Sequence, residues 1–128
     1  MMTRPWPEIV AHYGEYEGEA RSIRALAQLT HQISESHLAK GLFAWTSMFD
    51  LCIVQRPVSY QYDSPLLRMS PIDKDRLEFR YLDTWEKAKQ WHRTVDADQA
   101  MPRLIKFLDQ LRWFSADVLE SVSRDQSS

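Results

Sequence analysis

The chain has 128 residues, which is the size of one domain. Its 16 Lys and Arg residues against 18 Asp and Glu residues give a net charge of −2. This balance argues against a dedicated binder of nucleic acid or of an anionic membrane, because such proteins usually carry a basic excess. We expect a single domain over residues 1–122, followed by a frayed polar tail over residues 123–128.

Two helices are predicted in the first third of the chain. Apolar side chains recur at spacings of three and four from Trp6 to Tyr13, and Gly14 and Gly18 break or bend this short helix. A longer helix is predicted from about Glu17 to Ser36, with its apolar stripe formed by Ile23, Leu26, Ala27, Thr30 and Ile33.

Strands are predicted in the middle of the chain. Residues 42–54 alternate with period two and predict one long strand with a bend near Ser47–Asp50. Leu66–Ser70 and Arg76–Asp83 predict a hairpin, because the intervening Pro-Ile-Asp-Lys-Asp is turn chemistry. Trp91–Val95 is a plausible fourth strand.

The last predicted element is a long helix from about Asp98 to Val122, with a wide apolar stripe. Because the sheet has one strongly apolar face, helices packed on that face explain the whole pattern. The sequence therefore predicts an α+β fold, with an antiparallel sheet of about four strands against an N-terminal helix and a long C-terminal helix.

The polar face of the predicted sheet is a candidate site. Alternation places Arg68, Glu78 and Arg80 on this face, and Asp50 joins them if its strand has the matching parity. Either His92 or Arg93 extends the row, depending on the parity of the fourth strand. Two guanidinium groups on adjacent strands could hold a carboxylate or phosphate. The alternative is that these opposite charges pair across strands on a solvated face and bind nothing.

Aromatic residues form 12% of the chain, and Trp and Tyr are enriched at interfaces. Trp113, Phe114 and Trp6 are candidate interface residues, although the same rings could fill the core. Together with the apolar stripes of the terminal helices, they lead us to expect self-association as a two-fold homodimer.

Other catalytic signatures are missing from the sequence. The four histidines lack metal-ligand spacing, and the single Cys52 lies in a predicted strand, where a buried thiol is inert. We therefore expect no metal, no cofactor, no membrane-spanning segment and a cytoplasmic location. The preferred hypothesis is a non-enzymatic, self-associating domain that binds a partner or a small anionic or aromatic ligand. The alternative is an acid–base enzyme whose cleft is lined by Arg68, Glu78, Arg80 and His92.

Overall fold

The computed structural model describes residues 1–16 and 20–127, and it confirms the α+β fold. Its elements in chain order are α1 (Trp6–Gly14), α2 (Arg21–Ser34), η1 (His37–Lys40), β1 (Phe43–Ser47), β2 (Asp50–Val54), β3 (Leu66–Pro71), β4 (Arg76–Leu82), η2 (Lys87–Lys89), β5 (Trp91–Asp96), η3 (Ala97–Gln99), α3 (Ala100–Gln110) and α4 (Ala116–Ser127). Residues 17–19, where the second helix was expected to begin and where Gly18 lies, are outside the described residues.

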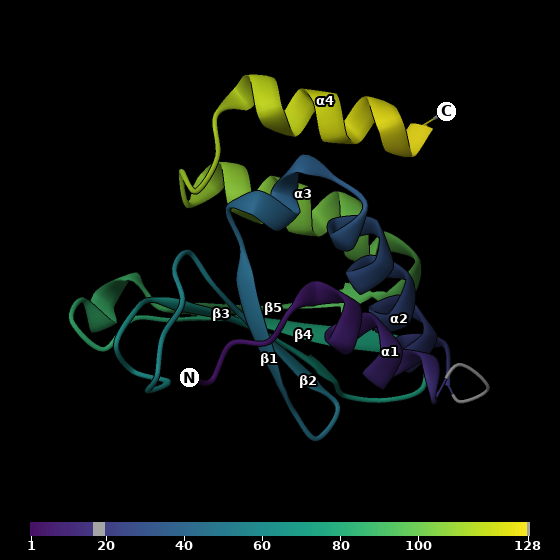
Figure 1. Ribbon diagram of the computed structural model, residues 1–128, viewed down its shortest axis with the longest axis horizontal. Coiled ribbons are helices and arrows are strands. Elements are labelled where there is room, and N and C mark those ends of the chain that lie inside the picture. The colour runs from purple at the N-terminus through teal and green to yellow at the C-terminus, as the bar shows by residue number, and fades with distance from the viewer. Residues whose placement is uncertain (17–19, 128) are drawn as a thin grey trace.

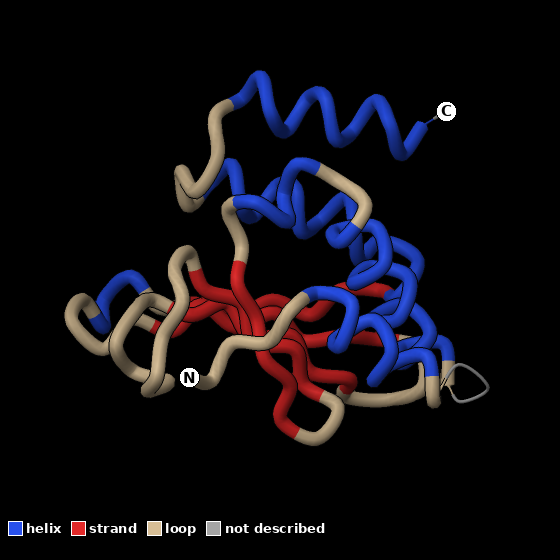
Figure 2. Tube along the Cα trace, viewed as in Figure 1, coloured by secondary structure: helices blue, strands red, loops and turns tan. Residues whose placement is uncertain are grey.

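The five strands form one antiparallel sheet in the order β1-β2-β3-β4-β5, one strand more than the sequence predicts (Figure 1). Figure 2 shows α1, α2, α3 and α4 gathered on one side of this sheet, with α4 the farthest from it. The sheet therefore has an inner face under the helices and an outer face turned away from them. This arrangement follows from the wide apolar stripes of α2 and α3, which need an apolar surface to cover.

The main core lies between the inner face and the helices. Leu67 and Met69 of β3 and Phe79 of β4 are fully buried there, against Leu26 of α2 and Leu104 of α3. The hairpin from β3 to β4 confirms the predicted pairing, since Arg68 is the Cα partner of Arg80 and Met69 that of Phe79. Alternation along these strands decides which side chains meet the helices and which remain outside.

The predicted long strand over residues 42–54 is wrong, because the segment is a hairpin of β1 and β2. Ser47 pairs with Asp50, so only Met48 and Phe49 form the turn. Met48 has a φ of 56°, a conformation that normally favours glycine. Because the turn has two residues, the pair Trp45 and Cys52 lies on the outer face and the pair Ala44 and Ile53 lies on the inner face. Trp45 and Ile53 are therefore on opposite faces, whereas a single continuous strand would place them on the same face.

The predicted single C-terminal helix is divided into α3 and α4. Arg112 takes a φ of 61°, its amide donates to the Asp109 carbonyl, and the Trp113 amide donates to the Leu108 carbonyl. These two bonds are the Schellman pattern that ends a helix, with arginine where glycine is usual. Ser115 then caps α4 by accepting from the Val118 amide at 3.3 Å. Residues 123–127, expected in the tail, continue α4.

A small second core covers part of the outer face, where the apolar side chains Trp45, Cys52, Val54, Val58 and Leu66 are buried together. The N-terminal segment closes it, because the Met2 amide donates to the Val58 carbonyl and the Arg4 amide donates to the Ala44 carbonyl. The rest of the outer face is polar. Among the described residues, the helices are too short or too polar to cross a bilayer.

Candidate functional site

The polar part of the outer face contains every residue that the sequence analysis assigns to it. Arg68, Arg80 and His92 are successive cross-strand partners on β3, β4 and β5. Asp50 and Glu78 lie on the same face, one alternation away on β2 and β4. The structure therefore gathers these five side chains on one surface.

Four of these side chains already bind one another. Arg68 Nε donates to Asp50 Oδ2 at 2.8 Å, and both side chains are only about one-fifth exposed. Arg80 Nε lies 3.3 Å from Glu78 Oε1, and Arg80 Nη2 lies 4.0 Å from Asp50 Oδ2. Two guanidinium groups thus face two carboxylates, and no net charge is left for an anionic ligand. This favours cross-strand pairing as the role of the network.

The His92 side chain is exposed and has no hydrogen bond or ion pair with any described residue. It therefore lacks the carboxylate partner that would orient it as a general base. Cys52 lies opposite Arg68 in the ladder and is fully buried. Burial raises the pKa of Cys52 to about 11, against the opposing effect of Arg68, so the thiol is protonated and a poor nucleophile near neutral pH.

The aromatic residues divide into buried and exposed groups. Trp6 is buried, and its Nε1 donates to the Leu42 carbonyl at 3.0 Å. Trp113 and Phe114 are half-buried and pack against the main core. Instead, the three most exposed rings among the described residues are on two loops, and Phe49 in the β1–β2 turn is exposed to a smaller extent. Trp85 is 71% exposed and follows Thr84, whose hydroxyl donates to the carbonyl of Tyr62 at 3.4 Å.

Tyr60 and Tyr62 are 55% and 44% exposed, and their ring centroids lie 5.3 Å apart in an edge-on arrangement. Trp85 is on a second loop, which the Thr84–Tyr62 hydrogen bond joins to the loop of Tyr60 and Tyr62. We call these three exposed rings the aromatic patch (Tyr60, Tyr62 and Trp85). Exposed Tyr and Trp rings are typical of interaction surfaces.

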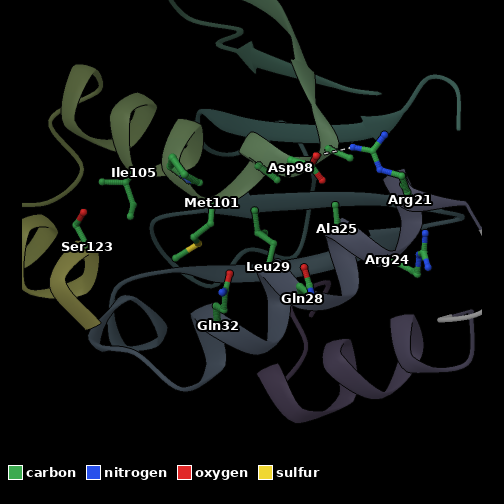
Figure 3. Close-up of a pocket in the computed structure, with 13 residues that line it drawn as sticks. Arg21, Arg24, Ala25, Gln28, Leu29, Gln32, Asp98, Met101, Ile105 and Ser123 are labelled. Atoms are coloured by element: carbon green, nitrogen blue, oxygen red, sulfur yellow. Dashed lines mark ion pairs between the residues drawn. The ribbon is translucent and has the colours of Figure 1, made fainter. Parts of the chain in front are cut away.

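The helical side of the molecule contains a groove of about 610 Å³ between α2, α3 and the end of α4 (Figure 3). Its volume falls within the range of small-molecule sites. The apolar floor consists of Ala25 and Leu29 of α2 with Met101 and Ile105 of α3. None of the five residues of the outer-face network lines it.

One wall of the groove is polar. Arg24, Gln28 and Gln32 lie at intervals of four residues along α2, so they form a single stripe on that helix. Within the described part of the chain, none of these three side chains has a hydrogen-bond or ion-pair partner. Figure 3 shows Arg24 near the N-terminal end of α2 and Gln32 toward the other end of the groove.

Arg21, the other cation of the groove, is occupied by three carboxylates. Its guanidinium contacts Asp75 and Asp98 at 2.8 Å and Asp96 at 3.3 Å. Hydrogen bonds to Asp98 and Asp75 raise the pKa of Arg21. These contacts connect the start of α2 to the β3–β4 turn and to the end of β5 and η3, the segment that precedes α3. Arg21 is therefore already paired within the protein.

This groove is not predicted from the sequence, although the stripe of Arg24, Gln28 and Gln32 is visible in it. A polar stripe of this kind is typical of a solvated helix face, so it does not by itself indicate a site. The apolar floor could not be predicted, because Leu29 is on α2 and Met101 is on α3, and all five strands lie between these helices in the sequence. Among the described residues, no three His, Cys, Asp or Glu side chains are grouped so as to hold a metal ion.

Comparisons with known proteins give no relative from which a function could be transferred. No protein-family model matches the chain, and neither the curated proteins nor the solved structures contain a match. The groove, the outer-face network and the aromatic patch are therefore the features that bear on the function of this chain.

Proposed function

We propose that the protein is a non-catalytic binding domain whose ligand occupies the groove between α2 and α3. The observation that carries this proposal is the pairing of an apolar floor with a wall of polar side chains that have no partner among the described residues. An apolar floor supplies affinity, while a few polar groups orient a ligand, and this combination is typical of binding sites. The acid–base alternative is less well supported, because Arg68, Glu78 and Arg80 are paired in a network away from the groove and His92 has no carboxylate partner among the described residues.

The experiment that tests the proposal fills the groove. Ala25 is buried in the groove floor, so Ala25→Leu should occupy part of the ligand volume. Native mass spectrometry of freshly purified protein reports any retained small molecule, and NMR shift mapping with a fragment mixture reports weak binding. We expect the parent to show binding at α2 and α3, and Ala25→Leu to lose it.

Two controls separate occupancy of the groove from a general effect of the substitution. Ala11 is exposed on α1, away from the groove, so Ala11→Leu makes the same chemical change and should leave binding unchanged. Because Ala25→Leu could disturb the core, Gln28→Leu provides a second test at an exposed wall position. Binding that resists both groove substitutions, or no binding by the parent, would overturn the proposal.

We also propose that the domain self-associates, most simply as a two-fold dimer, through the aromatic patch. Tyr and Trp are the residue types that most often dominate interface energetics, and these rings are accessible. Light scattering at micromolar concentration should give a mass above that of one chain, and Trp85→Ser should reduce it. Ile72→Ser is the matched control, because Ile72 is 45% exposed on a different loop. A single-chain mass for the parent would refute self-association.

We further propose a cytoplasmic location. Cys52 is unpaired and buried in its protonated form. A single free cysteine is typical of proteins from reducing compartments. Fractionation of cells that produce the protein tests this directly, and recovery outside the cytoplasmic fraction would contradict it.

A further inference from the structure

The two cations that line the groove differ in their surroundings. Arg21 contacts three carboxylates, Asp75, Asp96 and Asp98, of which Asp98 also lines the groove. Because Arg21 is held by Asp75, Asp96 and Asp98, Arg24 is the cation left to meet a ligand. The electrostatic complement of the Arg24 side chain is therefore an anionic group.

The polar wall has a spacing that matches an extended main chain. A rise of about 1.5 Å per residue places Arg24, Gln28 and Gln32 about 6 Å apart in turn. An extended peptide repeats its same-side groups every two residues, or about 6.6 Å. A side-chain amide is both donor and acceptor, so it can pair with a main-chain carbonyl and amide. The flexible glutamine side chains can accommodate the remaining difference in length.

The floor of the groove suits side chains of differing shape. Ala25 leaves room beside α2, while Met101 is unbranched and adapts to its neighbour. Leu29 and Met101 are buried, and Ile105 is half-buried. An extended segment that turns alternate side chains toward this floor would cover these apolar groups while its main chain faces the wall.

We infer that the groove binds a short extended peptide whose free carboxyl end lies at Arg24 and whose main chain pairs with Gln28 and Gln32. This inference rests on the proposed function and names its ligand class. A long-chain carboxylate would also satisfy Arg24 and the floor. It would, however, cover the two glutamine amides without giving them partners, which is unfavourable. The peptide uses all three polar side chains.

The test uses NMR shift mapping with three probes: a mixed hexapeptide library with free carboxyl ends, the same library with amidated ends, and decanoate. We expect the free-carboxyl library to shift the amide signals of α2 and α3, and the amidated library to bind at least fivefold more weakly. Arg24→Gln should weaken binding of the free-carboxyl library by about tenfold, since charge-assisted hydrogen bonds to a carboxylate are strong. Gln28→Leu combined with Gln32→Leu should also weaken it.

The control for charge removal is Lys106→Gln, because Lys106 is exposed on α3 and does not line the groove. It should leave peptide binding unchanged. Peptide binding that ignores both amidation and Arg24→Gln would overturn the inference, as would an absence of peptide binding. If decanoate binds in the groove while the peptides do not, the peptide inference fails and the proposed binding function stands.

Discussion

Gly41 is the position where the smallest change should disturb the connection between the sheet and the C-terminal helices. A Cβ atom placed on Gly41 would lie 2.8 Å from Phe114 Cε1 and 3.0 Å from Phe114 Cζ. Carbon atoms normally approach to about 3.5–4.0 Å, so the ring would have to move. Phe114 belongs to the link between α3 and α4 and packs against the main core.

The expected cost of Gly41→Ala follows from two opposing effects. Overpacking costs about 1–3 kcal/mol, and replacing glycine stabilises by about 0.4–1 kcal/mol through the unfolded state. We therefore expect the free energy of unfolding to fall by about 1–2 kcal/mol, which lowers Tm by roughly 3–8 °C. Thermal and urea denaturation measure both quantities.

Gly14→Ala is the matched control. Gly14 ends α1, and a Cβ atom added there would have no described atom within 4 Å, so alanine should stabilise by up to about 1 kcal/mol. In a Phe114→Ala background, Gly41→Ala should lose its cost, because the obstructing ring is gone. If Gly41→Ala stabilises the parent as Gly14→Ala does, the proposed contact with Phe114 is not limiting and the reasoning is refuted.

Three further substitutions test other parts of the structure. Because burial raises the pKa of Cys52 from 9.0 to about 11, the folded state retains a proton that the unfolded state loses. The contribution of Cys52 to stability should be full below pH 9 and fall by about 2 kcal/mol as the pH rises to 11. Urea titrations should show a shallower loss for Cys52→Ala over that interval, and an unchanged slope would contradict the assignment. Asp50→Asn should lower the free energy of unfolding by about 1–2 kcal/mol, and Glu78→Gln should lower it by less than about 1 kcal/mol. The reason is that the Asp50–Arg68 ion pair is shorter and less exposed than the Glu78–Arg80 ion pair. Equal losses from the two substitutions would contradict this ranking. Arg112→Gly should raise the free energy of unfolding by about 0.5–1 kcal/mol, because glycine adopts a positive φ without steric strain. Arg112→Ala should give no such gain, and a gain from both substitutions would argue against backbone strain at this position.

The elements that the sequence predicts correctly are those with standard turn chemistry. The β3–β4 hairpin has Pro71 and Asp73 around its turn and alternating side chains on both strands, so its two faces could be assigned. The same alternation assigns His92 to the outer face once β5 is paired with β4. Local sequence was sufficient to predict a hairpin and its two faces where typical turn residues lie between two segments of alternating apolar and polar side chains.

The two incorrect elements share one physical cause. In each, a long side chain occupies a positive φ that normally indicates glycine: Met48 in the β1–β2 turn and Arg112 at the end of α3. Because no glycine marks either position, the spacing of apolar residues continues unchanged through the turn and through the helix end. The sequence pattern therefore predicts one long strand and one long helix. In the β1–β2 turn, tertiary contacts offset the local cost, since His12 Nε2 donates to the Met48 carbonyl and the Tyr13 hydroxyl donates to the Phe49 carbonyl. Such contacts are invisible in a single sequence.

The edges of the sheet decide how copies of the domain could meet. The edge at β1 is partly covered, because the Arg4 amide donates to the Ala44 carbonyl. At the other edge, Arg93 of β5 lies on the inner side yet remains exposed, with its guanidinium over the Trp91 ring at 5.6 Å. An inward-facing charge on an edge strand discourages the addition of another strand. The proposed association between copies should therefore use side-chain contacts at the aromatic patch, which is why Trp85→Ser is expected to reduce the mass in solution. An Arg93→Thr variant should then associate no less than the parent, whereas a loss of association would place the interface at the β5 edge.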